Sequence, residues 1–372
     1  MSGSPLPTAV ATVTSLREFD ELAAPWDDLH RASAGAIPFL RHSWLRIWWE
    51  HFGGGADLEI VVARRGERLA AALPLHRGHE RLGLFPLRTL EGLSNDHSFR
   101  FGPLCRDDEP EALEAIWAHL RSIESSWDLV LLREVAEAEG EEERDRLFAM
   151  ATRDGYPAGI WHSYASPYLR LGTAWETYIG RLPGKFRYSL RSRAKKLDAE
   201  GPVTFELLRD GEVTDAILDG CFDVERRGWK GEAGSAIASD PALHSFYAAV
   251  ARDAGSRGAL RVGRMRIGER IAAFDLSFQE GDRYYCLKIG YDPDFARFGV
   301  GQLLNARILE WCCGAGVTDY EFLGPLTEAK DAWQPSIRRH VWIYLFGRGH
   351  VPRAAHAFKF VLGNAIRRKV TP

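Results

Sequence analysis

The sequence predicts a mixed α/β protein made of two tandem domains, each a mixed, mostly antiparallel sheet flanked by helices. The chain has 372 residues, which is enough for two domains of ordinary size. Helix-like and strand-like segments recur in a similar order in its two halves. The halves differ in charge: residues 1–160 contain 17 Arg, no Lys and 27 acidic residues, whereas residues 161–372 contain 31 basic and 24 acidic ones. We therefore expect domains at 1–165 and 166–372, the second better suited to an anionic ligand.

The composition is that of a folded globular protein, with 45% hydrophobic and 27% charged residues. The five cysteines are odd in number and fall in no C-x-x-C or Cys/His ligand spacing, so neither a disulfide framework nor a metal site is predicted. No run of eighteen apolar residues and no secretory signal is present, so we expect a cytoplasmic protein. Its charges are mixed, with a net charge of −3, and do not indicate a nucleic-acid partner.

Helices and strands alternate in the first half. Apolar residues alternate along 58–64 and 69–76 on either side of a glycine turn, which is typical of a hairpin. An aromatic segment at helical spacing, 38–52, ends at three glycines and predicts a helix. The elements expected here are, in order, strand 9–15, helices 16–32 and 38–52, strands 58–64 and 69–76, helix 113–123, strand 129–132 and a helix ending at 151.

The second half repeats this order and contains the clearest strand pattern, a three-strand meander over 260–291. Pro183 and Gly184 separate its first two helices. The elements expected are helices 175–182 and 185–199, strand 203–208, helices 213–227 and 241–254, strands 260–267, 270–279 and 283–291, helix 301–313, strands 319–323 and 341–346, and helix 352–368.

The most informative segment is 288–311, KIGYDPDFARFGVGQLLNARILEW. A strand ends at Tyr291, and glycines open a helix after a short loop. Glycines let backbone N–H groups approach a ligand, and a helix N-terminus adds partial positive charge, so this geometry suits a pyrophosphate. A plain tight loop is the alternative interpretation. The residues expected to contact the cofactor are Gly299, Val300, Gly301 and Gln302.

This loop resembles the acyl-CoA loop of the GNAT acyltransferase superfamily, which runs Arg/Gln-x-x-Gly-x-Gly/Ala. Ala296, Gly299 and Gly301 occupy its three marked positions, so the leading basic residue is absent and Arg297 lies one place later. The resemblance implies acyl-CoA, specifically acetyl-CoA, as co-substrate in the second half, with no metal.

Three segments together resemble the CelD-like acetyltransferases, a double-GNAT family associated with cellulose and exopolysaccharide synthesis and related to the Fem-type aminoacyltransferases. They are KFRYSLRSRAKKLDAEG at 185–201, GYDPDFARFGVGQLL at 290–304, and DYEFLG at 319–324 with the later KDAW at 330–333. The resemblance covers most of the chain and is strongest from 171 to 346. It implies two GNAT-like domains, the first degenerate, and an acyl-CoA-binding second domain.

The helix expected at 185–199 carries six cations, which repel one another at i,i+4 unless an anion offsets them. One interpretation is a solvated basic face; the other is contact with CoA phosphates or with a phosphorylated acceptor. Arg187 and Arg191 share a face and are the preferred pair, because guanidinium binds phosphate bidentately. The six are Lys185, Arg187, Arg191, Arg193, Lys195 and Lys196.

The meander supplies the candidate catalytic groups. Asp275 is the only charged residue in the middle of its strand, and apolar neighbours would raise its pKa, which suits a general base. A structural carboxylate is the alternative. On the next strand, alternation predicts that Tyr285 and Tyr291 share a face, opposite Cys286 and Lys288. Tyr291 or Tyr285 could act as the acid that protonates the leaving thiolate, and Tyr291 is the preferred one.

Two further segments supply expected contacts with the acceptor. Lys330 and Trp333 match a Lys-x-x-Trp of the resembling family, which implies a catalytic lysine that holds an anionic acceptor and a tryptophan in the cleft wall. A surface lysine and a core tryptophan are the alternatives. In the first half, Asp96 and His97 lie in a polar loop and are candidate acceptor contacts, with an ordinary turn as the alternative.

These observations predict an acyl-CoA-dependent N- or O-acyltransferase acting on a small-molecule or saccharide acceptor, such as a sugar, cell-wall or exopolysaccharide precursor. Aminoacyl-tRNA-dependent transfer, as in the Fem relatives, is a second hypothesis, against which the acidic first half argues. A non-catalytic scaffold in peripheral contact with a membrane polysaccharide-synthase complex is a third.

Overall fold

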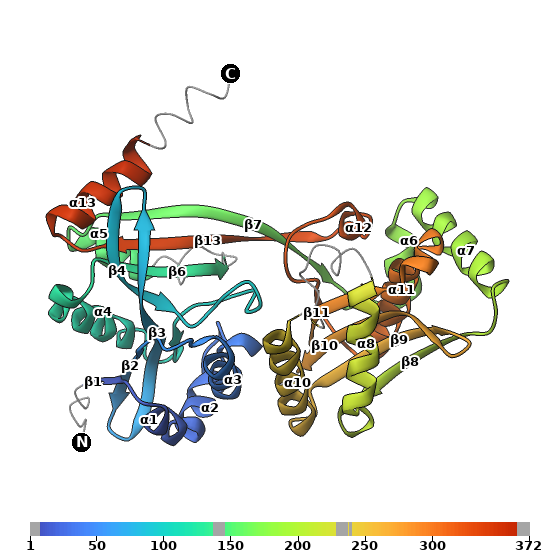
Figure 1. Cartoon of the computed structure of the whole chain (residues 1–372), viewed down its shortest axis with the longest axis horizontal. Helices are drawn as coiled ribbons and strands as arrows, with labels where there is room; N and C mark the ends of the chain where they lie inside the picture. Colours follow the sequence, from blue (N-terminus) through green and yellow to red (C-terminus); the bar gives the residue numbers. More distant parts are fainter. Residues whose placement is uncertain (1–7, 137–145, 228–236, 238–239, 363–372) are drawn as a thin grey trace. The chain divides into compact units, whose positions relative to one another are not determined.

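The computed structural model describes residues 8–136, 146–227, 237 and 240–362 (Figure 1). Its contacts divide the chain into two compact units, Met1–Tyr164 together with Arg339–Pro372, and Ala165–Arg338. The chain first changes unit one residue before the boundary expected from the sequence. Residues from Arg339 onward, however, fall in the first unit and not in the second, so the second unit is a continuous segment inserted into the first.

The first unit is a mixed sheet with helices, in the strand order β1-β2-β3-β4-β6-β13-β7. The pairs β1 with β2, β2 with β3, β3 with β4 and β6 with β13 are antiparallel, whereas β4 and β6 run parallel through Thr89–Glu91 and Leu129–Leu131. The elements are β1 (Thr8–Val13), α1 (Leu16–Glu21), α2 (Ala23–Arg31), α3 (His42–Phe52), β2 (Leu58–Arg65), β3 (Arg68–Leu82), β4 (Phe85–Gly92), β5 (Leu104–Cys105), α4 (Ala112–Ser122), β6 (Leu129–Ala136), α5 (Arg146–Arg153), β7 (Ala158–Arg170), β13 (Ser336–Phe346) and α13 (His350–His356), which continues as a π-helix over Ala357–Leu362.

The single helix expected at 16–32 is two helices that break at Leu22. Pro25 explains the break, because its ring has no N–H to donate and would clash with the carbonyl of residue 21 in a continuous helix. The first helix is fixed by a capping box in which Ser15 and Glu18 satisfy each other's backbone N–H groups.

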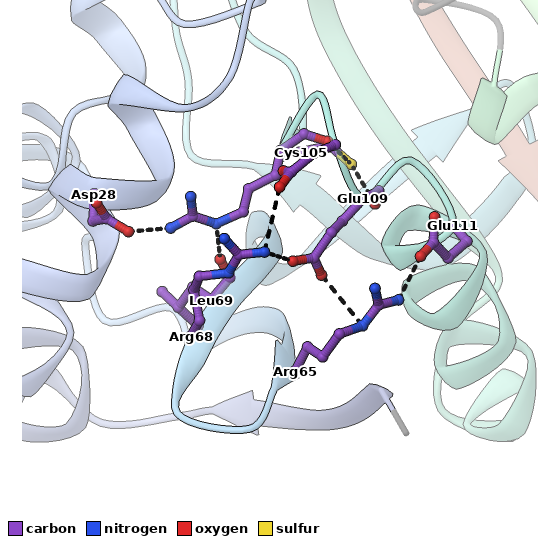
Figure 2. Close-up of polar contacts among 9 residues, drawn as sticks. Asp28, Arg65, Arg68, Leu69, Cys105, Glu109 and Glu111 are labelled. Atoms are coloured by element: carbon purple, nitrogen blue, oxygen red, sulfur yellow. Dashed lines mark hydrogen bonds and ion pairs between the residues drawn. The ribbon is translucent and has the colours of Figure 1, made fainter. Parts of the chain in front are cut away.

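A network of ion pairs ties the β2–β3 turn of the first unit to the segment before α4 (Figure 2). The Glu109 carboxylate is only 2% exposed and pairs with both Arg65 and Arg68. Arg106 donates to the Leu69 carbonyl over 2.7 Å and pairs with Asp28. Every guanidinium of this cluster therefore has a carboxylate partner, as buried charge requires.

The second unit has the strand order β7-β12-β11-β10-β9-β8, with the first strand contributed by the C-terminal end of β7. Its elements are α6 (Trp175–Arg181), α7 (Gly184–Asp198), β8 (Val203–Arg209), α8 (Asp215–Arg227), α10 (Pro241–Ser256), β9 (Leu260–Ile267), β10 (Arg270–Glu280), β11 (Arg283–Tyr291), a 3₁₀ segment (Pro293–Phe298), α11 (Val300–Gly314), β12 (Asp319–Glu321) and α12 (Glu328–Asp331).

Helices cover both faces of the second sheet. A Cβ at Gly263 of β9 would contact Ile308 of α11 and Asp275 of β10, so Asp275 points to the α11 face. On the other face, the Lys288 ammonium of β11 lies 4.8 Å from the ring of Tyr247 on α10. A core of aliphatic and aromatic side chains fills the α11 face, where α6 and α7 also pack. The predicted fold class, two mixed and mostly antiparallel α/β units, is confirmed.

Candidate functional site

The parallel strands β11 and β12 separate part-way along their length. Their register runs only from Arg283 with Asp319 to Tyr285 with Glu321. Beyond that point β12 ends, and the Phe322 N–H donates to the Pro167 carbonyl instead. The part of β11 after Tyr285 therefore leaves the strand pair, which opens an edge of backbone N–H and carbonyl groups to a ligand.

A β-bulge at Leu287 turns the outer half of β11 over. Leu276 pairs with Lys288 and Ser277 pairs with Cys286, so Leu287 is an extra residue in β11. The expected sharing of one face by Tyr285 and Tyr291 is therefore wrong. The register puts Cys286 and Tyr291 on the α11 face and Lys288 on the opposite one. A single extra residue reverses every later side chain of a strand, and strict alternation does not anticipate it.

Gly299 is held in the left-handed region, with φ 60° and ψ 42°, where it ends the 3₁₀ segment and starts α11. The first hydrogen bonds of the helix run from the N–H groups of Gln302 and Leu303 to the Gly299 carbonyl. The N–H groups of Val300 and Gly301 precede that ladder and point out of the helix end. A Cβ at Gly301 would meet only the Tyr291 ring, at 3.8 Å, so the approach to this turn is open.

Arg193 of α7 lies against this helix start. A Cβ built on Gly299 would come within 2.5 Å of Arg193 Nη1, which shows how closely the guanidinium approaches this turn, while the positive φ is what favours glycine here. The sequence interpretation preferred Arg187 and Arg191 and passed over Arg193. The helical spacing of α7 could have identified it. Arg193 lies on the same face as Phe186, Leu190 and Leu197, at positions i, i+4, i+7 and i+11, so it is a cation on the face that packs on the domain.

The anion-binding groups of the loop fit a phosphate. A helix N-terminus with two outward N–H groups, a glycine in the left-handed region and an adjacent guanidinium together make a positively polarised, sterically open turn. The buried Asn305 Oδ1, one turn beyond Gly301, has no hydrogen-bond partner among the described residues and is a further polar group available to a ligand. Val300, in contrast, is fully buried and reaches a ligand through its backbone alone.

Trp333 contacts the loop through Gln302, whereas Lys330 holds the segment before α12. The Trp333 indole is fully buried and donates to Gln302 Oε1 over 2.6 Å, while Gln302 Nε2 donates to the Ala329 carbonyl. The Lys330 ammonium donates to the carbonyls of Leu323 and Pro325, at 2.6 and 3.0 Å. The structure thus supports the core alternative for Trp333, and the Lys330 ammonium caps backbone carbonyls where a catalytic role was expected.

The six cations of α7 have no ion-pair partner in the part of the chain that the structure describes. The Arg187 Nε atom is buried without a hydrogen-bond acceptor, although the residue as a whole is half-buried. Arg191, one turn later on the same face, is exposed. A buried donor without an acceptor costs on the order of 1–3 kcal/mol, which an acceptor at this position, such as an anion or a water molecule, would offset.

Asp275 lies in the core and not at the open edge. It is fully buried, and its Oδ1 accepts hydrogen bonds from Ser277 Oγ and, over 2.8 Å, from the Tyr284 hydroxyl. Burial raises its pKa to about 6, although hydrogen bonds from Cys286, Ser277 and Tyr284 oppose the shift. The raised pKa agrees with the expectation from the sequence. The enclosure favours the structural alternative, because a base must reach the proton that it removes.

Asp96 and His97 lie in the first unit and form a local turn. The His97 N–H donates to Asn95 Oδ1 over 3.0 Å, and the imidazole stacks on the Phe52 ring with centroids 5.9 Å apart. Asp96 is exposed. The polar loop thus has the ordinary turn structure that the sequence left as an alternative.

Comparison with known proteins agrees with this geometry. Residues 184–331 match the family described as "Acetyltransferase (GNAT) domain". The chain carries a GNAT-type acyltransferase domain. The match spans the α7 cations, the three-strand meander, the loop at Gly299 and Lys330. Trp333 lies just beyond it, and the loop with Asp96 and His97 lies outside it in the first unit.

Solved structures resemble both units together. A crystal structure of FemX aligns with 10% identity and a TM-score of 0.60, over 91% of this chain and 98% of that one. The C-terminal domain of a putative lysylphosphatidylglycerol synthetase from Agrobacterium fabrum aligns with 13% identity and a TM-score of 0.54, over 92% and 96%. A tandem GNAT protein from the clavulanic acid biosynthesis pathway aligns with 13% identity and a TM-score of 0.50, over 92% and 99%. At these identities the likeness establishes the fold.

No curated protein sequence matches the chain. Among the described residues, no group of three or more His, Cys, Asp and Glu side chains is arranged to hold a metal ion. Within the same residues, no helix combines the length and the apolar character needed to span a bilayer.

Proposed function

We propose that this protein is an acyl-CoA-dependent N- or O-acyltransferase that uses acetyl-CoA and acts on a sugar, cell-wall or exopolysaccharide precursor. The observation that carries the proposal is the start of α11: a left-handed Gly299, two outward N–H groups and the Arg193 guanidinium beside a strand edge that has opened. The acceptor class rests on the resemblance of the second half to the CelD-like acetyltransferases.

In this proposal the pyrophosphate of CoA binds to the N–H groups of Val300 and Gly301, with Arg193 as the cation. Arg193 takes the role of the basic residue that is missing at Ala296, reaching the same place from α7. The pantetheine arm pairs with the free edge of β11. A backbone N–H near the Leu287 bulge then polarises the thioester carbonyl, because a bulged residue leaves ladder groups unpaired.

The chemistry relies mainly on positioning. The acceptor amine or hydroxyl attacks the thioester carbonyl, the carbon–sulfur bond breaks, and the thiolate takes up a proton. Tyr291 is 38% exposed and adjoins Gly301, so its hydroxyl is the acid that we assign to this protonation. Asp275 is enclosed and leaves the removal of the acceptor proton to water or to an acceptor that arrives uncharged.

The test is isothermal titration with acetyl-CoA and with CoA, on the parent protein and on two variants of α11. Gly301→Glu puts a carboxylate among the outward N–H groups and should abolish binding. Gly314→Glu adds the same charge at the far end of the same helix, where a Cβ meets nothing within 4 Å, and should bind as the parent does. Micromolar binding lost only in Gly301→Glu would support the proposal and justify an acceptor screen that begins with amino sugars.

Absence of heat with either ligand, from protein shown to be folded, would contradict the proposal. Aminoacyl-tRNA-dependent transfer and the scaffold role would then remain, and retention by a membrane synthase complex would favour the scaffold.

A further inference from the structure

A cavity of about 580 Å³ lies in the second unit between α6, α7, α11 and the strands β8 and β9. This volume falls within the roughly 300–1,000 Å³ range of small-molecule sites. None of the four loop residues from Gly299 to Gln302 lines it, so its wall is distinct from the proposed acyl-CoA loop. Its lining residues are Trp175, Ile179, Arg187, Leu190, Arg191, Ala194, Leu197, Asp198, Val203, Phe205, Met265, Leu303, Ala306, Arg307 and Glu310.

The floor of the cavity is apolar. Leu197 is 1% exposed, Met265 4% and Leu303 6%, and Val203 and Phe205 of β8 extend the same surface. Such a floor offers no hydrogen-bond partners to the polar edge of a nucleotide base, and burying those groups unpaired is costly. The floor suits a hydrocarbon chain, because a chain that binds there removes apolar surface from water, which is favourable.

The charges of the cavity lie at opposite ends of α7. Arg187 and Arg191 are in the first half of the helix, and Asp198 is its last residue. At about 1.5 Å per residue, Arg187 and Asp198 are roughly 16 Å apart along the axis. Arg307, from α11, already pairs with Glu310 over 2.9 Å. An anion would therefore bind at the Arg187 end.

Among the described residues that line the cavity, Arg187 carries a buried donor without an acceptor. Its Nε is buried without an acceptor, and it has no ion pair among the described residues. Arg191 is its i,i+4 neighbour, so the two guanidinium groups can hold one anionic group between them, and without an anion their charges repel.

We propose that this cavity binds a single-chain anionic amphiphile, with its phosphate or carboxylate on Arg187 and Arg191 and its hydrocarbon chain along the floor formed by α7, α11 and β8. The site is a second ligand site, independent of acyl-CoA binding at Gly299–Gln302.

Isothermal titration with decyl phosphate tests the proposal, with inorganic phosphate and 1-decanol as the head-only and chain-only probes. We expect decyl phosphate to bind at least tenfold more tightly than either. Arg187→Gln should weaken binding at least tenfold, and Ala194→Trp, which fills the cavity from α7, should abolish it. Lys196→Gln removes an exposed cation of the same helix that does not line the cavity and should have no effect. Circular dichroism of each variant verifies that it is folded.

Three results would overturn the proposal. If inorganic phosphate bound as tightly as decyl phosphate, the site would recognise the anion alone and not the hydrocarbon chain. Equal losses in Arg187→Gln and Lys196→Gln would mean that only the general charge of α7 matters. Displacement of decyl phosphate by CoA would make the cavity part of the acyl-CoA site. Gly301→Glu, which disables the proposed acyl-CoA loop, should still bind decyl phosphate, so failure of either proposal is seen separately.

Discussion

One cluster of the first unit pairs each of its arginines with a carboxylate, whereas the cations of α7 in the second unit have no ion-pair partner among the described residues. In the network of Figure 2, Arg65 and Arg68 share the buried carboxylate of Glu109, and Arg106 pairs with Asp28. On α7, six cations have no carboxylate partner among the described residues. The first arrangement is complete without a ligand and holds two segments of the chain together. In the second, Lys185, Arg191, Lys195 and Lys196 are exposed, so that solvent or a ligand balances their charge.

Buried carboxyls show the same contrast. Glu109, 2% exposed, is compensated by two guanidinium groups. Asp275 is fully buried with only O–H and S–H donors around it, and burial raises its pKa to about 6. A buried carboxylate loses the free energy of hydration of its charge, and hydrogen bonds without a neighbouring cation do not make up for that loss.

The largest effect is expected at Glu109. Glu109→Gln should lower the free energy of unfolding by about 3 kcal/mol, because it removes the buried carboxylate that Arg65 and Arg68 share and leaves them only the exposed carboxylates of Glu111 and Asp108. Urea denaturation measures this. Glu111→Gln is the control: Glu111 is 54% exposed and pairs with Arg65, so its loss should cost under about 1 kcal/mol. Equal costs for the two variants would show that the network is merely a surface feature.

A smaller effect, with a defined pH dependence, is expected at Asp275. Its pKa is about 6 in the folded protein and about 4 in the unfolded chain, so the folded state holds the proton more tightly. Stability due to this group is fully present below about pH 4 and falls as the pH rises to about 6. Asp275→Asn should therefore be more stable than the parent at pH 7, by on the order of 2 kcal/mol, and equal to it near pH 4.

Thermal denaturation of parent and Asp275→Asn across pH 4–7 measures this difference. Retained acetyl transfer in the variant would establish Asp275 as structural. A variant that is less stable at neutral pH, or a folded variant that has lost all activity, would return Asp275 to the role of base.

The smallest effect is expected on α7. Arg191→Gln removes two like-charge i,i+4 pairs, with Arg187 and with Lys195, and should raise stability by roughly 0.5 kcal/mol. Urea denaturation at low salt detects it, and added salt should diminish the gain because it screens repulsion between exposed charges. A loss of stability would mean that Arg191 has a structural partner. The difference between α7 and the ion-pair network of Figure 2 would then disappear.

Much of the second unit was predictable because its signals are local. The meander over β9, β10 and β11, the helix of α11 and the glycine loop before it follow from alternation, turn residues and helical spacing. The α1–α2 break at Leu22 was also within reach, since Pro25 carries a local signal that the continuous helical pattern obscured.

Other features depend on residues far apart in the sequence. Arg193 lies against Gly299 because α7 packs beside the start of α11, which comes more than a hundred residues later in the sequence. The bulge at Leu287 depends on the register with β10, and the enclosure of Asp275 depends on the packing of α11, whose buried Cys312 lies near enough to interact with it. The return of residues after Arg339 to the first unit depends on β13 pairing with β6.

The sequence by itself determined the fold class, the charge difference between the halves, the glycine loop before α11 and the row of cations on α7, since each is set by the order and spacing of neighbouring residues. Only the tertiary structure decided which cations face a cavity, which carboxyl is out of reach and which tyrosine adjoins the loop. The reason is physical: burial and pairing are set by long-range packing, and a single bulge or strand pairing reverses the environment of a side chain without changing a residue.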